Sequence, residues 1–321
     1  MKNILIFGAT GLIGTYLIDY LRGNYNLFAV KNKTDFYHKY DDVNYIQCSI
    51  TEKESFKNLP KNIDTVVMLA GLLPAGMKGY YPENYFHVNT IGALNVLEYC
   101  RLNNVKQIIY TQTHSDVKKL WGTGTIDPYA TYSIDYNNDH TVYVISKNAS
   151  VELIKHYHEA YGLKYAIFRC PNIYAWHPDT YYYLNGKKTV IAYRLFIQNA
   201  INSMPIEIYG NGREKRDVVY VKDLTQMIDK AISKEIKQGI YNVSNGVAIS
   251  IEEQVKATIK VFSPINNPSK IIYRPDKVIE NLNYHYDISN AVQDLDYKPK
   301  FFIEEMLIDM KNEMTTNRLF K

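Results

Sequence analysis

The sequence predicts an α/β protein in which a doubly wound parallel sheet carries a smaller α/β lobe, formed mainly by the C-terminal part. Three observations lead to this fold class. Strand-like and helix-like patterns alternate over the first two thirds of the chain, as they do where helices connect parallel strands. Three glycines, each three residues from the next, separate the first strand from the first helix. The alternation breaks after Pro171, where a stretch with several prolines and tyrosines begins.

The first element is a short apolar strand, 4–7, which runs directly into these glycines and then into a helical pattern over 12–22. Gly8 permits the tight turn, Gly11 lets the backbone approach a pyrophosphate, and Gly14 lets the helix pack against the strand. The free amides and the positive dipole end at the start of the helix suit phosphate groups. The residues expected to form this nucleotide-binding opening are Gly8, Thr10, Gly11, Leu12, Ile13 and Gly14.

Further strands and helices follow in alternation. The strand patterns are 27–30, 45–47, 65–69, 107–111 and 165–169, and the helical patterns lie near 52–58, 84–104 and 142–161. The strand at 65–69 leads into a loop of small residues ending at Gly71. Such a loop lets the backbone come close to a ligand at the carboxyl edge of the sheet, where open α/β folds bind nucleotides.

The second half is less regular and contains no low-complexity linker, so it is expected to be a lobe fused to the sheet. Its patterns are a helix at 190–202, a short strand after Pro205, strands at 217–221 and 240–243 around a helix at 223–233, and a final amphipathic helix near 303–315. We assign residues 1–171, with about 217–243, to the sheet domain, and residues 172–216 with 244–321 to the lobe.

The composition is that of an ordinary globular protein, with 46% apolar and 22% charged residues. The net charge of +4 is spread without long runs of one sign, which predicts neither a nucleic-acid nor a membrane partner. Cys48, Cys100 and Cys170 are odd in number and lack metal-ligand spacing, so no metal site is predicted and a reducing compartment is expected. Without a membrane span or signal pattern, the expected location is the cytoplasm.

Tyr143 and Lys147 are the candidate catalytic pair, because a spacing of four places both side chains on one helix face. A nearby ammonium stabilises tyrosinate and lowers the phenol's pKa, which makes it a usable proton acceptor. The same spacing recurs at Tyr183/Lys187 and Tyr273/Lys277. Position decides between them, because only Tyr143 follows the fifth strand and begins a long helix that returns to the sheet.

Together these motifs resemble the extended short-chain dehydrogenases/reductases of the NAD(P)-dependent nucleotide-sugar epimerase/dehydratase family, and the resemblance runs nearly end to end. The matching segments, in family order, are the three glycines, 69–71, 84–92, Tyr143 with Lys147, 169–174, 208–223, 241–243, 274–276 and 287–291. The resemblance implies a Rossmann domain that binds NAD(P) and a lobe that binds a nucleoside-diphosphate sugar.

The resemblance also assigns individual site residues. Thr113 takes the place of the family's Ser/Thr that hydrogen-bonds the reacting sugar oxygen, with Thr111 and Ser115 as alternatives. Arg216 and Arg274 would grip the diphosphate, a ligand that suits bidentate guanidinium groups, and Asn172 would add a polar contact. The further substrate contacts are His114 and Asp276. The further cofactor contacts are Asn32, Lys33, Ser49, Ile50, Leu69, Ala70, Gly71, the buried Asn89, Tyr143 and Lys147.

Three departures from the family pattern bear on the reaction, the cofactor and the substrate pocket of this chain. His114 and Ser115 replace the acidic residues that follow the Ser/Thr in dehydratases, which argues against 4,6-dehydration. Asn32, flanked by two lysines, replaces the acid that binds the adenosine ribose, which favours NADP over NAD. Ser49 replaces an aspartate that commonly touches adenine, and the segment 116–140 lacks the family's tyrosine-glycine turn and is expected to shape an unusual substrate pocket.

The resulting hypothesis is an NAD(P)-dependent nucleotide-sugar 4-epimerase that acts through hydride transfer and a 4-keto sugar. The alternative is an NADPH-dependent nucleotide-4-keto-sugar reductase. A 4,6-dehydratase and a dinucleotide-sensing protein without catalysis rank below both. A homodimer is expected, because the helices at 84–104 and 142–161 resemble those that form the family's four-helix interface.

Overall fold

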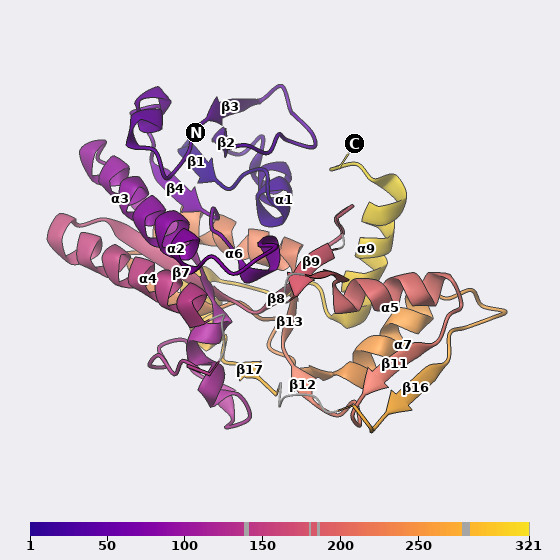
Figure 1. Ribbon diagram of the computed structural model, residues 1–321. Helices are drawn as coiled ribbons and strands as arrows, with labels where there is room; N and C mark the ends of the chain where they lie inside the picture. Colours follow the sequence, from indigo (N-terminus) through magenta and orange to yellow (C-terminus); the bar gives the residue numbers. More distant parts are fainter. Residues whose placement is uncertain (138–140, 180, 185–186, 278–282, 321) are drawn as a thin grey trace.

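The computed structural model describes residues 1–137, 141–179, 181–184, 187–277 and 283–320, and it confirms the doubly wound parallel sheet (Figure 1). Seven parallel strands lie in the order β14-β7-β5-β4-β1-β2-β3. Their bounds are β1 Asn3–Phe7, β2 Asn26–Lys31, β3 Val43–Gln47, β4 Thr65–Met68, β5 Gln107–Thr113, β7 Lys164–Cys170 and β14 Gln238–Asn242. The order reverses direction between β1 and β4, which is where such sheets form a ligand crevice at their carboxyl ends.

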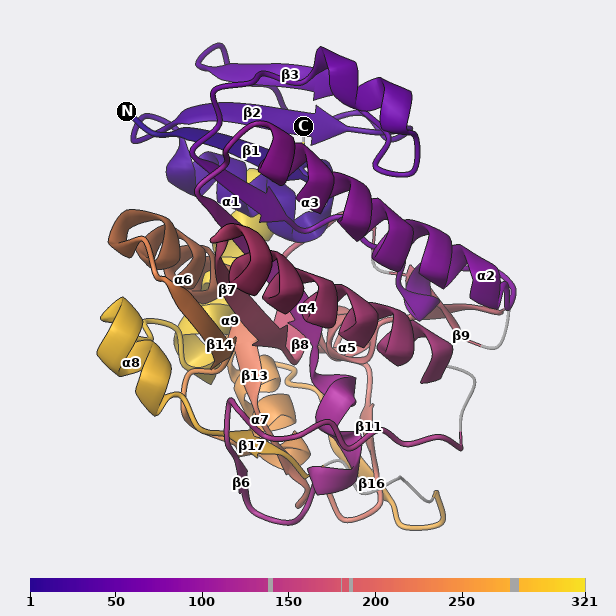
Figure 2. The same cartoon turned by 90° about the vertical axis from the view of Figure 1, so that its left-hand side faces the viewer.

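Helices cover both faces of the sheet. One face packs against α1 (Leu12–Leu21), α6 (Val221–Lys234) and α8 (Ser289–Leu295). The other packs against α3 (Gly92–Leu102) and α4 (Thr141–Tyr161), which run side by side across the sheet in Figure 2. The strands are buried on both faces, which explains why β4 reads as a continuous apolar run and not as an alternating one.

The second lobe has its own apolar core, formed by α5 (Ala192–Ile201), α7 (Ile251–Phe262), α9 (Ile303–Thr316) and the parallel pair β11 (Ile206–Tyr209) and β16 (Ile271–Arg274). The remaining short strands are β6 Thr125–Ile126, β8 Asn172–Tyr174, β9 Tyr181–Leu184, β10 Lys187–Val190, β12 Lys215–Arg216, β13 Val218–Tyr220, β15 Ile249–Ser250 and β17 His285–Tyr286. β13 pairs with β8, and the chain then enters α6 and β14 on the large sheet. The chain therefore crosses between the two cores more than once.

Two predicted helices differ from their sequence patterns. The pattern at 84–104 is not one α-helix: α2 (Pro82–Tyr85) and α3 are joined by a π-helical turn, η3, at Phe86–Ile91. The Ser150 hydroxyl donates to the Asn89 carbonyl at 2.8 Å and so satisfies an acceptor within this wide turn. The pattern at 52–58 is a 3₁₀ helix, η1 (Lys53–Asn58), with no buried residue. The antiparallel hairpin β9–β10 had no clear sequence signal.

No helix in the described parts of the chain is both long enough and apolar enough to cross a membrane. Cys48, Cys100 and Cys170 are all unpaired thiols. The first two are buried, and Cys170 is half-buried at the carboxyl end of β7.

Candidate functional site

The three glycines form a compact turn between β1 and α1. Gly8 has a φ of +80°, and a Cβ there would lie 2.6 Å from the Ala70 backbone nitrogen. A Cβ at Gly14 would lie 2.6 Å from the Ala9 Cα, so only glycine allows α1 to approach the turn this closely. At Gly11 the nearest atom to an added Cβ is the Gly8 carbonyl oxygen at 3.4 Å, and the residue borders a cleft. The start of α1 therefore presents backbone amides to that cleft, as a phosphate site requires.

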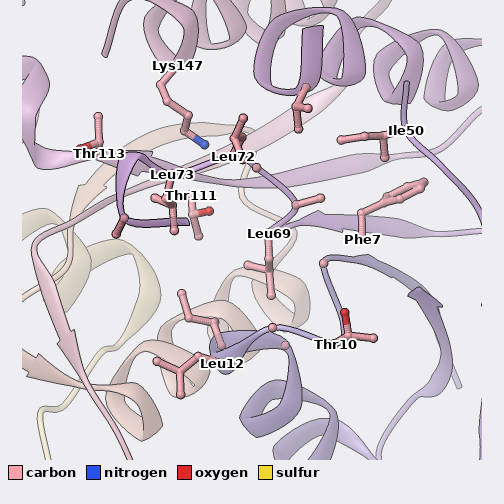
Figure 3. Close-up of a pocket in the computed structure, with 18 of the residues that line it drawn as sticks. Phe7, Thr10, Leu12, Ile50, Leu69, Leu72, Leu73, Thr111, Thr113 and Lys147 are labelled. Atoms are coloured by element: carbon pink, nitrogen blue, oxygen red, sulfur yellow. The ribbon is translucent and has the colours of Figure 1, made fainter. Parts of the chain in front are cut away.

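The cleft has a volume of about 960 Å³ and follows the carboxyl ends of the strands. The sequence-predicted residues that line it are Gly8, Thr10, Gly11, Leu12, Ile13, Gly14, Asn32, Lys33, Ser49, Ile50, Leu69, Ala70, Gly71, Thr113, His114, Tyr143, Lys147 and Asn172. Figure 3 shows Thr10 and Thr113 at different ends of this space, with Leu69 between them. The fold thus brings the glycine turn and the predicted catalytic residues into one cavity.

The loop after β4 is held in place by Asn89, which does not itself line the cleft. Its Oδ1 accepts from the Leu72 amide at 2.7 Å, and its Nδ2 donates to the Leu72 carbonyl at 3.1 Å and to the Ser146 hydroxyl at 3.0 Å. Asn89 is 1% exposed, so all of these bonds are shielded from water. Asn89 therefore supports the loop that borders the cleft, and its side chain is not among the described residues that line it.

Tyr143, Thr113 and Lys147 converge at one end of the cleft. Burial raises the pKa of Tyr143 above its ordinary value, while a hydrogen bond with Thr113 lowers it. Lys147 projects from α4 toward the strand ends, as Figure 3 shows, and its Nζ lies 4.0 Å from the centroid of the Tyr110 ring. A Cβ on Gly71 would lie 3.2 Å from the Asn89 Oδ1, so the glycine leaves room for the asparagine that holds this loop. The sequence-based expectation that Lys147 lowers the pKa of Tyr143 is not met in the ligand-free protein, because burial dominates.

Comparison with known proteins identifies the relatives of this chain. The sequence model of the NAD dependent epimerase/dehydratase family matches residues 4–244. The chain belongs to the NAD dependent epimerase/dehydratase family. It is 26% identical to a putative UDP-glucose 4-epimerase of Methanocaldococcus jannaschii, over 98% of this chain and 99% of that protein. It is 24% identical to the dTDP-glucose 4,6-dehydratase of Haemophilus influenzae, over 96% of each.

A solved structure supports the fold of this epimerase/dehydratase-family chain. The UDP-glucose 4-epimerase of Thermotoga maritima, solved with UDP-glucose, aligns with a TM-score of 0.80 over 99% of this chain and 100% of that one. The identity is 21%, so this likeness concerns the fold. The relatives include both epimerases and dehydratases, and the reaction of this family member must therefore be argued from its own residues.

At the adenine-ribose end predicted for the cofactor, the two lysines differ. The Lys31 ammonium donates to Asp35 at 3.0 Å, which offsets its charge. Lys33 is exposed, lines the cleft, and makes no ion pair with any described residue. The Asn32 carbonyl accepts from the Gln47 side chain at 2.7 Å. Lys33 is therefore the free cation at this end among the described residues.

The predicted diphosphate residues are only partly brought together. Asn172 lines the cleft and donates to the Tyr284 hydroxyl at 3.3 Å. Arg274, by contrast, pairs at 2.7 Å with Glu207 and at 2.9 Å with Asp276. Arg216 has a buried Nε with no hydrogen-bond partner in the described chain. Arg216, Arg274 and Asp276 are not among the residues that line the cleft.

Sequence reasoning missed two groups of residues near the site. Tyr182 and Tyr183 of β9 line the cleft, and β9 packs against η2 (Pro74–Gly76) in the loop after β4. Tyr284 and Tyr286 surround His114, more than 160 residues away in sequence. The tyrosines at 181–183 were visible as a cluster, but no periodic pattern marked a hairpin, and the contact at 284–286 follows only from the tertiary fold.

Lys147 provides a pH-dependent prediction for the ligand-free protein. Burial lowers its pKa to about 7, and Cys170 opposes this shift. Between this value and the ordinary lysine pKa, the unfolded chain holds one more proton than the folded one, so the free energy of unfolding rises with pH by about 1.4 kcal/mol per pH unit for this group. We expect Lys147→Met to remove this contribution between about pH 7 and about pH 8.5. The cysteines, whose ordinary pKa is about 8.5, titrate in both proteins, so the difference between the two slopes measures Lys147. Urea unfolding of both proteins measures it; equal slopes would contradict the low pKa.

Proposed function

We propose that this chain is an NAD(P)-dependent nucleotide-sugar 4-epimerase that works through a 4-keto sugar. The observation that carries the proposal is that Tyr143, Thr113 and the buried Lys147 all line the cleft that also contains the glycine turn. Two hydroxyl groups that can take part in proton transfer thus lie in the same cleft as backbone amides that can bind the pyrophosphate of a dinucleotide. Residues 1–171 with 217–243 would hold the dinucleotide, and the remaining lobe would hold the nucleotide sugar.

The described residues fit a nicotinamide dinucleotide. Glycine at positions 8 and 14 allows the tight turn, and the open face of Gly11 leaves the start of α1 accessible to a pyrophosphate. Lys147 and Tyr143 would meet the nicotinamide end, and Asn32 with Lys33 the adenosine end. When bound, the dinucleotide supplies a hydride acceptor in its oxidised form and a hydride donor in its reduced form.

The role proposed for the chain's own groups is proton transfer and orientation. Thr113 would hold the oxygen on the reacting carbon, and Tyr143 in its tyrosinate form would take the proton from that oxygen as the carbon becomes a ketone and its hydride passes to the dinucleotide. Lys147 is neutral or charged within the working range, since its pKa lies at about 7. In its charged form it would stabilise the tyrosinate. Return of the proton from Tyr143 accompanies reduction of the ketone, and reduction on the opposite face inverts the configuration.

One observation favours the reductase as a second candidate. Lys33 is an exposed cation at the cleft, able to contact a ribose 2′-phosphate, so it favours NADP. A reductase would draw NADPH from solution, whereas an epimerase recycles one bound dinucleotide. The dehydratase ranks third because Asp116, the acid nearest to Thr113 in the chain, is committed to Arg169 with Nε–Oδ1 at 3.0 Å. A sensor without catalysis has no need of a buried tyrosine-lysine pair, and it ranks last.

A homodimer forms part of the proposal. The helical segment 82–102 exposes the apolar side chains of Phe86 and Ile91, and α4 exposes that of Ile145. These lie on the two elements that would form a four-helix interface with a second copy. Apolar side chains left exposed on these helices would be buried in such an interface.

The test of this function uses the purified, full-length protein. Mass spectrometry of the denatured sample identifies any retained dinucleotide, and a panel of UDP-, dTDP-, GDP- and CDP-sugars is then incubated with the protein and the products are read by NMR. An epimerase is expected to retain its dinucleotide and to interconvert C4 epimers without added cofactor. Turnover that needs added NADPH and a 4-keto sugar would instead establish the reductase. Loss of water from the sugar would contradict both.

A further inference from the structure

His114 directly follows Thr113 and stands at a position where family dehydratases carry an acid. Its side chain is half-buried and lines the cleft. The imidazole ring lies 4.9 Å from the Trp121 ring and 5.0 Å from the Tyr284 ring, centroid to centroid. This aromatic enclosure fixes the plane of the ring, so that its two nitrogens point in defined directions.

One of these nitrogens is already engaged by the protein. His114 Nδ1 and the Tyr286 hydroxyl lie 2.9 Å apart. Tyr286 is 1% exposed, and its backbone amide donates to the Asp217 carboxylate at 2.7 Å, which holds the residue in place. The other nitrogen, Nε2, makes no hydrogen bond with any described residue and is not enclosed by protein. It is therefore free to meet a ligand in the cleft.

The tautomer of His114 follows from the hydrogen bond that the Tyr286 hydroxyl donates. Burial holds the pKa of this phenol well above its ordinary value, so the hydroxyl keeps its proton and must donate it. Nδ1 of His114 is its only acceptor among the described residues. The indole Nε1 of Trp121 also faces the hydroxyl without completing a hydrogen bond, and an indole is a donor only. If Nδ1 carried the proton instead, a buried hydroxyl would lose its acceptor, and an unsatisfied buried donor is unfavourable.

The imidazole is also neutral. Burial lowers the pKa of His114 to about 3, and the charge of Arg169 adds to this effect. A histidine with so low a pKa gives up its second proton far below neutrality and cannot act as the acid that expels a hydroxyl group. With Nδ1 accepting from Tyr286, a neutral ring carries its hydrogen on Nε2.

We propose that His114 is a neutral hydrogen-bond donor to the sugar, with its Nε2–H directed at the 3-hydroxyl or 6-hydroxyl oxygen on either side of the reacting carbon, and that Tyr286 is the positioning residue that fixes this tautomer. The inference rests on the proposed function, because it needs a sugar beside Thr113. It also gives that function a selectivity: sugars that keep the accepting hydroxyl are preferred over their deoxy forms.

The tautomer is tested without any substrate. The protein contains eight histidines, and ¹⁵N-histidine labelling with His114→Gln assigns the signal of interest. We expect His114 to show a protonated Nε2 and an unprotonated Nδ1 at neutral pH, and Tyr286→Phe to shift this pattern toward a mixture. Tyr284→Phe is the matched control, since its ring packs on the same imidazole but its hydroxyl accepts from Asn172. A protonated Nδ1 or an imidazolium in the wild type would overturn the inference.

The donor role is tested with UDP-glucose and its 3-deoxy and 6-deoxy analogues. The wild type should disfavour one analogue by about 10- to 100-fold in kcat/KM. His114→Met, which removes the donor, should lose a similar factor with UDP-glucose and treat that analogue and UDP-glucose alike, whereas His114→Gln, which keeps an N–H, should recover most of the loss. Equal behaviour of the Met variant and the wild type would refute the donor role. If another nucleotide sugar of the panel reacts in place of UDP-glucose, the deoxy analogues of that sugar are used. If none of the panel reacts, the proposed function fails, while the NMR result still decides the tautomer.

Discussion

Replacing Tyr143 by phenylalanine should reduce turnover by about 10²- to 10⁴-fold while leaving the fold intact. The hydroxyl is the proposed proton carrier, and it contacts Thr113 at the end of the cleft. The ring itself is 8% exposed and packs 5.8 Å from the Tyr85 ring, so phenylalanine keeps the packing that tyrosine provides. The loss should appear in kcat more than in KM, because the proton moves in the chemical step.

The measurement compares turnover, retained dinucleotide and unfolding temperature in the two proteins. Tyr157→Phe is a matched control, because it makes the same change on the same helix but removes a hydroxyl that donates to Glu98 outside the cleft. That control should keep its activity. If Tyr143→Phe turned over at the wild-type rate with its dinucleotide in place, Tyr143 would not be the base.

Replacing Arg169 by methionine should lower the free energy of unfolding by about 3–5 kcal/mol. Arg169 is 2% exposed and Asp116 is 1% exposed, and the guanidinium Nε lies 3.0 Å and 3.1 Å from the two carboxylate oxygens. The same guanidinium donates at 2.9 Å to the Pro128 carbonyl and at 2.9 Å to Asn242. The substitution therefore leaves a buried carboxylate without its partner and releases contacts that join the segment after β5 to the sheet.

The pH dependence of this loss distinguishes a charge effect from a packing effect. Burial raises the pKa of Asp116 to about 6 even with Arg169 lowering it, and removal of the guanidinium should raise it further. A carboxyl whose folded-state pKa lies above its unfolded value loses stability as the pH rises through the window between the two. The variant should thus be more strongly destabilised at about pH 8 than at about pH 5.

The double variant Asp116→Asn with Arg169→Met is the control, because it removes the buried charge along with its partner. It should recover a substantial part of the stability lost by Arg169→Met alone. Urea unfolding at one fixed protein concentration measures all three proteins. A double variant as unstable as the single one, with no dependence on pH, would show that shape and not charge sets the loss.

Much of the sheet domain could be predicted from sequence because its signals are local. A strand buried on both faces needs an apolar run, and the turn at Gly8 and Gly14 needs residues without a Cβ. The predicted helix at 142–161 matches α4 closely, since its apolar spacing is uninterrupted. The helix at 84–104 was harder, because the π-turn around Asn89 depends on Ser150, a partner on another helix.

The predicted site residues also divide into those that a local pattern places correctly and those whose partners lie far away in the sequence. Residues that follow a strand end, such as Thr113 and Gly71, lie in the cleft because parallel strands deliver their carboxyl ends to one edge. Arg274 was assigned by its place in the family order, yet it pairs with Glu207 outside the cleft lining, and no local pattern signals that pair. The pKa of Tyr143 is raised, whereas the sequence predicts a lowered one, because burial depends on neighbours from the whole chain.

The parallel sheet, the glycine turn and the spacing of Tyr143 and Lys147 could be predicted from sequence, because each depends on backbone geometry or spacing within a few residues. The charge and the hydrogen-bond partners of the site residues became visible only in the folded chain. Burial of Lys147, the bond between His114 and Tyr286, and the Arg169–Asp116 pair all join residues distant in sequence. Desolvation and hydrogen-bond supply are properties of the packed surroundings, and they exist only once the chain has folded.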